Sequence, residues 1–120
     1  MSARAAASPE VLILMPATGD TLGPDVRIDL GANGIFIQAA SGTRVEGVAH
    51  HHLFLDTTAT PEGEVIPPTS SRVIHLGRGD STYTFTGLSP GEHQVIAVLA
   101  YGDHSAMPAR RDTVRFLVRR

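Results

Sequence analysis

The chain contains no cysteine and no tryptophan, and aromatic residues make up only 5% of its 120 positions. Without cysteine it can form no disulfide, no thiolate nucleophile and no cysteine-ligated zinc site. No stretch approaches the roughly 20 consecutive apolar residues that a membrane-spanning helix needs. The opening residues, MSARAAASPE, also lack the apolar segment of a signal peptide. We therefore expect no transmembrane segment, and no signal peptide is visible.

Strong charge imbalance and catalytic motifs are missing as well. The net charge is −2 and the isoelectric point about 6.3, so the sequence predicts no nucleic-acid partner and no general attraction to anionic membranes. The chain has no G-x-S-x-G nucleophile elbow, no phosphate-binding loop of the Walker type and no dinucleotide fingerprint. We accordingly expect a protein that is not an enzyme.

Glycine and proline are frequent, with 12 and 8 residues, and they divide the chain into short segments. Short apolar or alternating segments between turn residues are typical of strands in all-β proteins. We expect strands at residues 11–15 (buried), 25–30, 48–57, 73–76, 81–86, 92–101 and 113–118. They predict an immunoglobulin-like antiparallel β-sandwich of about seven strands with Greek-key connections. Residues 10–120 would form this single domain, after a flexible or partner-bound arm at residues 1–9.

The remaining segments are turns and loops in this interpretation. Residues 17–24 and 38–47 contain turn signals, and residues 35–37 are either a strand extension or an exposed apolar spot. Residues 58–72 carry several prolines and are predicted to be a long surface loop. The alternation of apolar residues also predicts a core. Its expected members are Val26, Ile28, Leu53, Leu55, Tyr83, Phe85, Val95, Leu99, Val114 and Phe116.

The segment 49–57, AHHHLFLDT, holds three of the six histidines. In a strand, His50 and His52 would share one face with Phe54 and Asp56, because successive side chains point to opposite sides. Two imidazoles at this spacing can bind one copper or zinc ion. The alternative is a polar strand whose imidazoles bond to backbone carbonyls.

Two ligands do not complete a metal site, so further ligands must come from elsewhere in the chain. His75 and His104 are the main candidates, and Asp56 is a weaker one. Unpaired buried imidazoles cost roughly 1–3 kcal/mol each. We therefore expect His50, His52 and His75 to lie within reach of one another, and the candidate metal ligands are His50, His52, His75 and His104.

His93 belongs to a corner, LSPGEHQV, that is similar to the tyrosine corner of immunoglobulin-like sandwiches. In that motif a tyrosine hydroxyl bonds to the backbone upstream, and His93 stands at the tyrosine position. An imidazole nitrogen can make a similar bond. We therefore predict a structural role for His93.

Four segments together, AHHHLFLDT, GEVIPP, RVIHLGRGDST and LSPGEHQVIAVLAYGDH, resemble the bacterial family known as domain of unknown function 4399. The resemblance implies a small exported sandwich domain, and hence a periplasmic or extracytoplasmic location. Family members carry further histidines in the loop after the long strand, where this chain has Ala106 and Ala109. The resemblance thus implies a weakened histidine site here.

Two functions follow from these observations. The first is a non-enzymatic interaction module, an accessory or structural subunit that docks on a protein partner or multi-subunit complex, membrane-bound or not. The prediction depends on the sandwich pattern, the missing catalytic set and the proline-rich loop. The second is a periplasmic protein that binds copper or zinc through its histidines.

Overall fold

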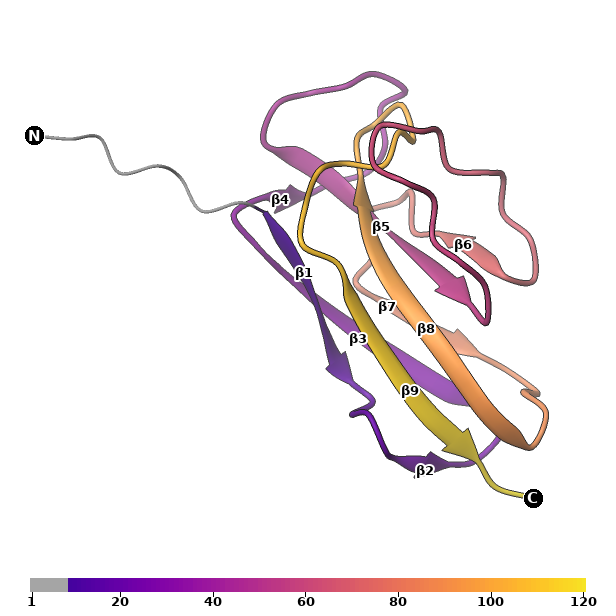
Figure 1. Cartoon of the computed structure of the whole chain (residues 1–120). Helices are drawn as coiled ribbons and strands as arrows, with labels where there is room; N and C mark the ends of the chain where they lie inside the picture. The colour runs from indigo at the N-terminus through magenta and orange to yellow at the C-terminus, as the bar shows by residue number, and fades with distance from the viewer. Residues whose placement is uncertain (1–8) are drawn as a thin grey trace, which may run out of the picture.

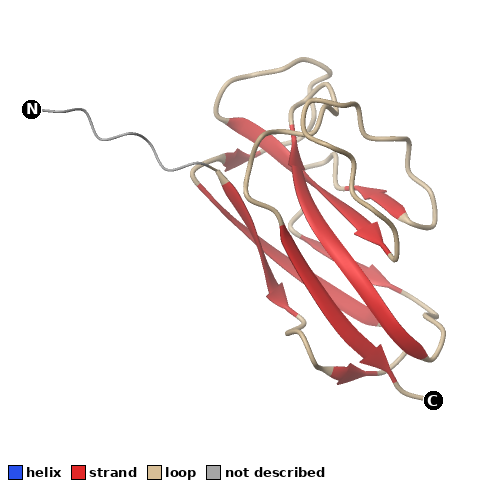
Figure 2. Ribbon diagram, in the orientation of Figure 1, coloured by secondary structure: helices blue, strands red, loops and turns tan. Residues whose placement is uncertain are grey.

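Nine β-strands and no helix make up residues 9–120, the part of the chain that this computed structural model describes (Figures 1 and 2). Consequently, no helix in this part is long and apolar enough to cross a membrane. The arm predicted at residues 1–9 lies outside the described residues except for Pro9. The strands are β1 (Glu10–Met15), β2 (Thr21–Leu22), β3 (Val26–Asn33), β4 (Phe36–Ile37), β5 (Val48–Leu55), β6 (Val73–His75), β7 (Thr82–Phe85), β8 (Gly91–Ala100) and β9 (Asp112–Val118).

The strands form two sheets that pack face to face, as Figure 1 shows. One sheet has the order β1-β3-β7, and the other has the order β2-β9-β8-β5-β4, with β6 also paired to β5. All pairs of longer strands are antiparallel, whereas the two-residue strands β2 and β4 pair in parallel with β9 and β5. The predicted β-sandwich is confirmed, with seven strands of three or more residues and two short additions at the edges.

The strand alternation expected from the sequence places the core correctly. Val26, Ile28 and Leu30 of β3 are buried, and nine of the ten predicted core residues are buried as well. Tyr83 is the exception, since it is only partly buried and packs against the edge of the core. Along β9, buried Val114, Phe116 and Val118 alternate with more exposed neighbours. These side chains fill the space between the sheets. The removal of their apolar surface from water is the main driving force for folding.

Strand β1 differs from the prediction of a fully buried first strand. Val11 is buried, but Leu14 and Met15 are 61% and 55% exposed. The reason is position: β1 is one of the two edge strands of the three-stranded sheet and only one of its faces meets the core, while an irregularity between Ile13 and Met15 breaks the alternation at its end. Strand β2 was not expected, because residues 17–24 have the composition of a turn. It consists of two residues that pair with Leu117 and Val118.

The segment of residues 58–72, which we call the strap, packs across the outer face of the larger sheet. Ile66 is buried there with Phe54, Val98 and Ala106 in a second, smaller apolar cluster. The strap also pairs with the chain after β8, through the Gly63 N–H to the Ala106 carbonyl (2.8 Å) and the Ile66 N–H to the His104 carbonyl (2.9 Å). The predicted surface loop is confirmed, since most of its residues are exposed, and through Ile66 it covers part of this face.

Candidate metal centre

Strand β5 positions the first two histidines of the site. His50 and His52 lie on the outer face with Phe54, while Leu53 and Leu55 face the core between the sheets, as their alternation predicts. Strand β5 is paired on both sides, with β8 along one edge and with β4 and β6 along the other. Its outer face is covered by the strap and the loop after β8. His50 and His52 are accordingly 1% and 0% exposed.

Strand register brings His75 to the same place. His75 of β6 is the direct cross-strand partner of His52, and opposed side chains in an antiparallel pair lie in contact. The two ring centroids are 4.2 Å apart. The Nε2 atom of His75 is 2.5 Å from the carbonyl oxygen of Pro67 in the strap, so this nitrogen carries the hydrogen and donates it. Of the three histidines expected to lie within reach of one another, His52 contacts both others, with ring centroids 4.5 Å from His50 and 4.2 Å from His75.

His104 reaches the cluster through a tight turn after β8. The Tyr101 N–H donates to the Ser105 carbonyl (3.0 Å), and the His104 N–H donates to the Tyr101 carbonyl (2.8 Å). His104 has a φ of 67°, in the left-handed region that few residues other than glycine adopt. The turn directs the chain back over the outer face, where Ala106 forms a bridge with Ala100. Ala100 is in turn the cross-strand partner of His50.

Several contacts hold this turn in place. The hydroxyl of Ser105 donates to the Asp103 carboxylate (2.5 Å) and accepts from the Arg44 guanidinium (2.9 Å), which also lies over the Tyr101 ring at 4.2 Å. Gly102 packs so closely that a Cβ atom there would lie 2.2 Å from the carbonyl oxygen of Thr43. A side chain at position 102 would therefore displace the turn that carries His104.

The assembled cluster has the dimensions of a metal site. His50, His52 and His104 each offer a ring nitrogen, and the three nitrogens lie within 4.8 Å of one another. The His50 Nε2 and His104 Nδ1 atoms are 3.2 Å apart. Ligating nitrogens of a tetrahedral zinc ion, bound at about 2.0–2.1 Å, are separated by about 3.3 Å. This pair already has the required spacing, and the widest pair must close by at most about 1.5 Å.

Most nitrogens of the buried rings have no partner among the described residues. Both ring nitrogens of His52 are buried without a hydrogen bond, whereas His50 pairs its Nε2 with His104 and leaves only its Nδ1 without a partner. Buried polar atoms are usually paired, and those that are not call for an explanation such as an ion. The alternative interpretation, in which backbone carbonyls satisfy the imidazoles, holds for His75 but not for His50 and His52.

Burial lowers the pKa of three histidines of the cluster, His50, His52 and His75. Burial, followed by repulsion from His104 and His75, lowers the pKa of His50 to about 4. Burial and the neighbouring histidines lower the pKa of His52 to about 2. Burial also lowers the pKa of His75, against the opposing effect of its bond to Pro67. Metal binding requires deprotonated imidazoles, so protons compete little with a metal ion for His50 and His52 near neutral pH.

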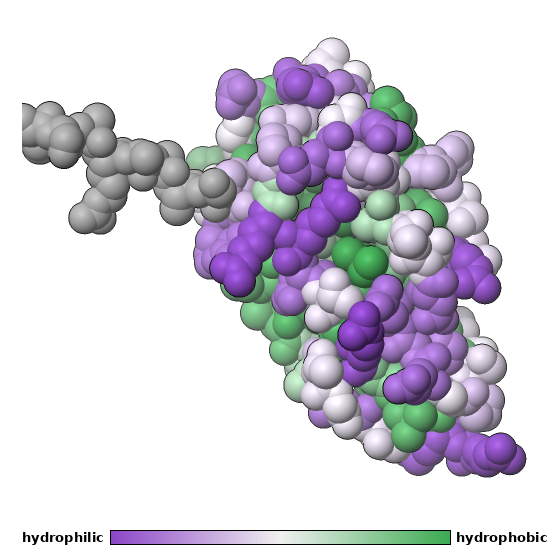
Figure 3. All heavy atoms as spheres, in the orientation of Figure 1, coloured by the Kyte–Doolittle hydropathy of each residue, from purple (hydrophilic) through white to green (hydrophobic). Residues whose placement is uncertain are grey.

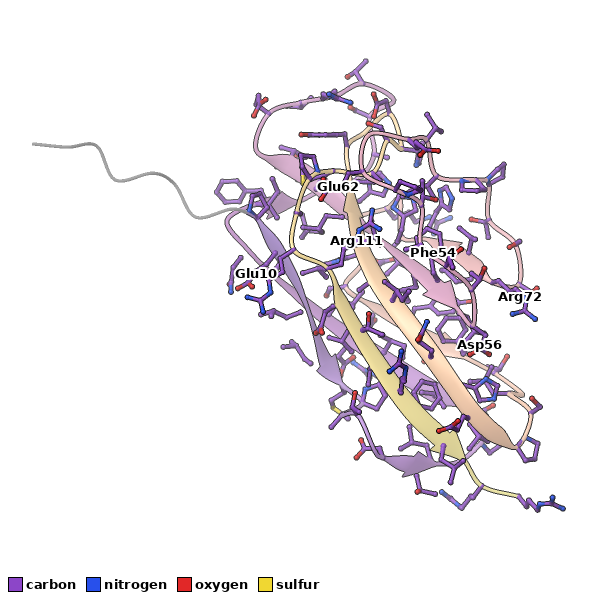
Figure 4. The ribbon with its side chains drawn as sticks, viewed as in Figure 1. Glu10, Phe54, Asp56, Glu62, Arg72 and Arg111 are labelled. Atoms are coloured by element: carbon purple, nitrogen blue, oxygen red, sulfur yellow. The ribbon has the colours of Figure 1, made fainter. Side chains whose placement is uncertain are left out.

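Asp56 does not join the cluster, contrary to its predicted place on the histidine face. The chain leaves the strand at Asp56, which has a φ of 53°. Its carboxylate accepts from His93 Nδ1 (2.6 Å) and from the Gln94 N–H (2.7 Å) instead. In Figure 4, Asp56 lies at the far end of β5, next to Arg72, whose guanidinium donates to the Asp56 carbonyl.

His93 has the structural role predicted for it. Its Nε2 donates to the carbonyl oxygen of Ser89, four residues upstream, at 2.7 Å. The bond replaces the one that a tyrosine hydroxyl makes in the related corner. The acceptor of its second nitrogen, Asp56, was not identified from the sequence, because a contact over 37 residues leaves no local pattern.

The alanines that replace expected histidines do not prevent the cluster from forming. Ala106 is fully buried beside Ala100 in the outer apolar cluster, and Ala109 packs against the main core. His104 is the residue of this loop whose ring nitrogen lies within 4.8 Å of those of His50 and His52. The four candidate ligands predicted from the sequence therefore lie together, and Asp56 is excluded from the set.

The sequence profile of domain of unknown function DUF4399 matches residues 28–119, which include all four histidines of the cluster. The chain belongs to the DUF4399 family. No curated protein matches this DUF4399 domain. Among solved structures it is similar to the fibronectin(III)-like modules of Clostridium thermocellum CbhA, with a TM-score of 0.55 and 16% identity. That likeness covers 91% of this chain and 96% of the other, and it establishes the sandwich fold.

Proposed function

We propose that this DUF4399 domain is a metal-binding module that holds one copper or zinc ion between His50, His52 and His104. The observation that carries the proposal is the convergence of three ring nitrogens within 4.8 Å on a covered sheet face. Imidazole is a ligand that both zinc and copper accept. The cluster contains no cysteine and no carboxylate, which argues against calcium or magnesium, since both prefer oxygen ligands.

Metal binding is compatible with the predicted extracytoplasmic location, which the family resemblance supports. Metal binding is also compatible with docking on a larger assembly, because the metal site occupies only one outer face of the sandwich. Both remain parts of the proposal, and the metal site is the part with a defined geometry.

The test is titration of the purified, chelator-treated chain with Zn²⁺ and Cu²⁺, followed by calorimetry and by thermal unfolding. We expect one ion per chain and a higher melting temperature, because a ligand that binds only the folded state stabilises it by about 2.7 kcal/mol at 100 times its dissociation constant. His104→Asn should weaken binding by at least about tenfold. Asparagine tolerates the left-handed conformation at this position, so the turn should be retained.

The matched control is His93→Tyr, which removes a histidine outside the cluster and introduces the residue common at this corner. It should bind metal like the unaltered chain. No heat of binding and an unchanged melting temperature with excess of both ions would refute the proposed function. Equal weakening by His93→Tyr and His104→Asn would show that binding occurs elsewhere.

A further inference from the structure

We propose that His75 is a fourth ligand of this site, and that the bound ion thereby locks the strap onto the sheet. The inference rests on the proposed metal function and specifies its coordination and its consequence. A site with four protein ligands is closed, and closed sites hold an ion, whereas catalytic zinc sites keep one position open for water. The domain would then carry or be stabilised by its ion.

The ring positions favour a four-histidine arrangement. Five of the six ring pairs among His50, His52, His75 and His104 have centroid separations between 4.2 and 5.7 Å. Four imidazoles around a tetrahedral ion would place their centroids about 5 Å apart. His75 lies in contact with both His52 and His104, at 4.2 and 5.1 Å.

The hydrogen bond of His75 prepares it to coordinate. A carbonyl oxygen only accepts hydrogen bonds, so Nε2 bears the hydrogen in the contact with Pro67 and Nδ1 keeps a free lone pair. Histidine ligands of metals commonly donate their other nitrogen to a backbone carbonyl in this way, which selects the tautomer and the ring orientation. His75 is not one of the three histidines whose nitrogens lie within 4.8 Å of one another, so it must move inward to coordinate; it is only half-buried and belongs to an edge strand of three residues.

The same contacts connect the site to the strap. Pro67 accepts from His75, and Ile66 donates to the carbonyl of His104, so consecutive strap residues bond to two of the four ligands. The Gly63 and Ala106 pairing continues this ribbon on the other side of Ser105. An ion that joins His75 and His104 to strand β5 would fix in place the groups to which Pro67 and Ile66 bond, and would so favour the closed strap. Local opening of the strap should therefore become rarer when the ion is bound.

Two measurements on the full chain test the inference. Amide hydrogen exchange, with and without Zn²⁺, should show the N–H groups of Gly63 and Ile66 exchanging at least about tenfold more slowly in the loaded protein. Co²⁺ as a spectroscopic probe should give the intense visible absorption of a four-coordinate ion. In His75→Ala, water takes the vacant position, so we expect weaker affinity, by about 10–100-fold, and loss of the strap protection at saturating Zn²⁺.

The outcomes separate this inference from the proposed function. If no metal binds to the unaltered chain, the proposed function fails and the inference fails with it. If metal binds, but His75→Ala has the same affinity and the same Co²⁺ spectrum, His75 is not a ligand and the three-histidine site stands. If Zn²⁺ leaves the exchange of Gly63 and Ile66 unchanged, the ion does not lock the strap. This last result needs no variant and holds even if His75→Ala does not fold.

Discussion

At the scale of single residues, His51 shows what a buried imidazole costs when it has no partner. It alternates with His50 and His52 along β5, is 0% exposed, and neither of its nitrogens has a hydrogen bond among the described residues. An orphaned polar group in a core opposes folding by roughly 1–3 kcal/mol. Burial has the same cost for His50 and His52 on the outer face, but a bound ion would offset it. His51 points away from their cluster and cannot reach that ion.

His51 should therefore make stability depend on pH. Burial lowers its pKa to about 4, against about 6.5 in an unfolded chain. Between these values the unfolded chain binds a proton that the folded chain does not. The free energy of unfolding is therefore independent of this group above pH 6.5. It decreases by about 1.4 kcal/mol per pH unit as the pH falls from 6.5 toward 4.

Urea unfolding of the metal-free chain between pH 7.5 and 4.5 measures this slope. His50 and His52 add slopes of their own, so the comparison with His51→Leu isolates one group. We expect the pH dependence of the variant to correspond to about one proton fewer taken up on unfolding. We also expect the variant to be at least as stable as the unaltered chain at pH 7.5. An identical slope in both proteins would show that His51 is protonated or solvated in the folded chain.

At the scale of elements, β5 and β9 illustrate two ways in which a strand is used. Strand β9 has one buried and one more exposed face, as expected for the side of a sandwich. Strand β5 is buried along nearly its whole length, because the strap adds a third layer over its outer face. In Figure 4 the strap passes Glu62, near Arg111, before it ends at Arg72. The Arg111 guanidinium donates to the carbonyl of Thr60 and helps to hold the strap in place.

The assignment of faces on β9 has a direct test. Phe116 is 2% exposed and its neighbour Leu117 is 42% exposed. Phe116→Ala should lower the free energy of unfolding by about 3–5 kcal/mol, because it leaves a cavity between the sheets. Leu117→Ala on the opposite face is the matched control and should cost less than about 1 kcal/mol. Denaturant unfolding of both variants gives the two values, and equal losses would mean that the faces are wrongly assigned.

At the scale of the whole molecule, the fold is a fibronectin-like sandwich with an additional covered face. This chain and the fibronectin(III)-like modules share the two-sheet arrangement, which by itself specifies no activity. On the face of residues 9–120 drawn in Figure 3, apolar residues form small patches among polar ones. Among the apolar side chains, Phe36 and Val65 are 74% and 68% exposed.

Docking on a larger assembly remains a prediction at this scale. If it is correct, the chain purified gently from its native source should carry a partner protein, and fractionation should place it outside the cytoplasm. Exposed apolar side chains such as Phe36 are the first candidates for the contact. A chain that runs alone as a monomer, with no co-purifying protein, would contradict the docking prediction and leave the metal site unaffected.

The sequence by itself determined the features that depend on local periodicity. Alternation predicted which side chains of β3, β5 and β9 face the core, and it placed His50 and His52 on one face, because a strand repeats every two residues. Turn residues predicted where the strands end, and the missing cysteines excluded thiolate ligands.

Only the tertiary structure decided which residues far apart in the sequence come into contact. His75 is opposed to His52 through the register of β5 and β6, and His104 arrives through a turn held by Arg44, Asp103 and Ser105. A left-handed residue at Asp56 directed its carboxylate to His93 instead of the cluster. Register, turn geometry and layer packing are set by contacts between residues far apart in sequence, and such contacts leave no pattern in any local segment.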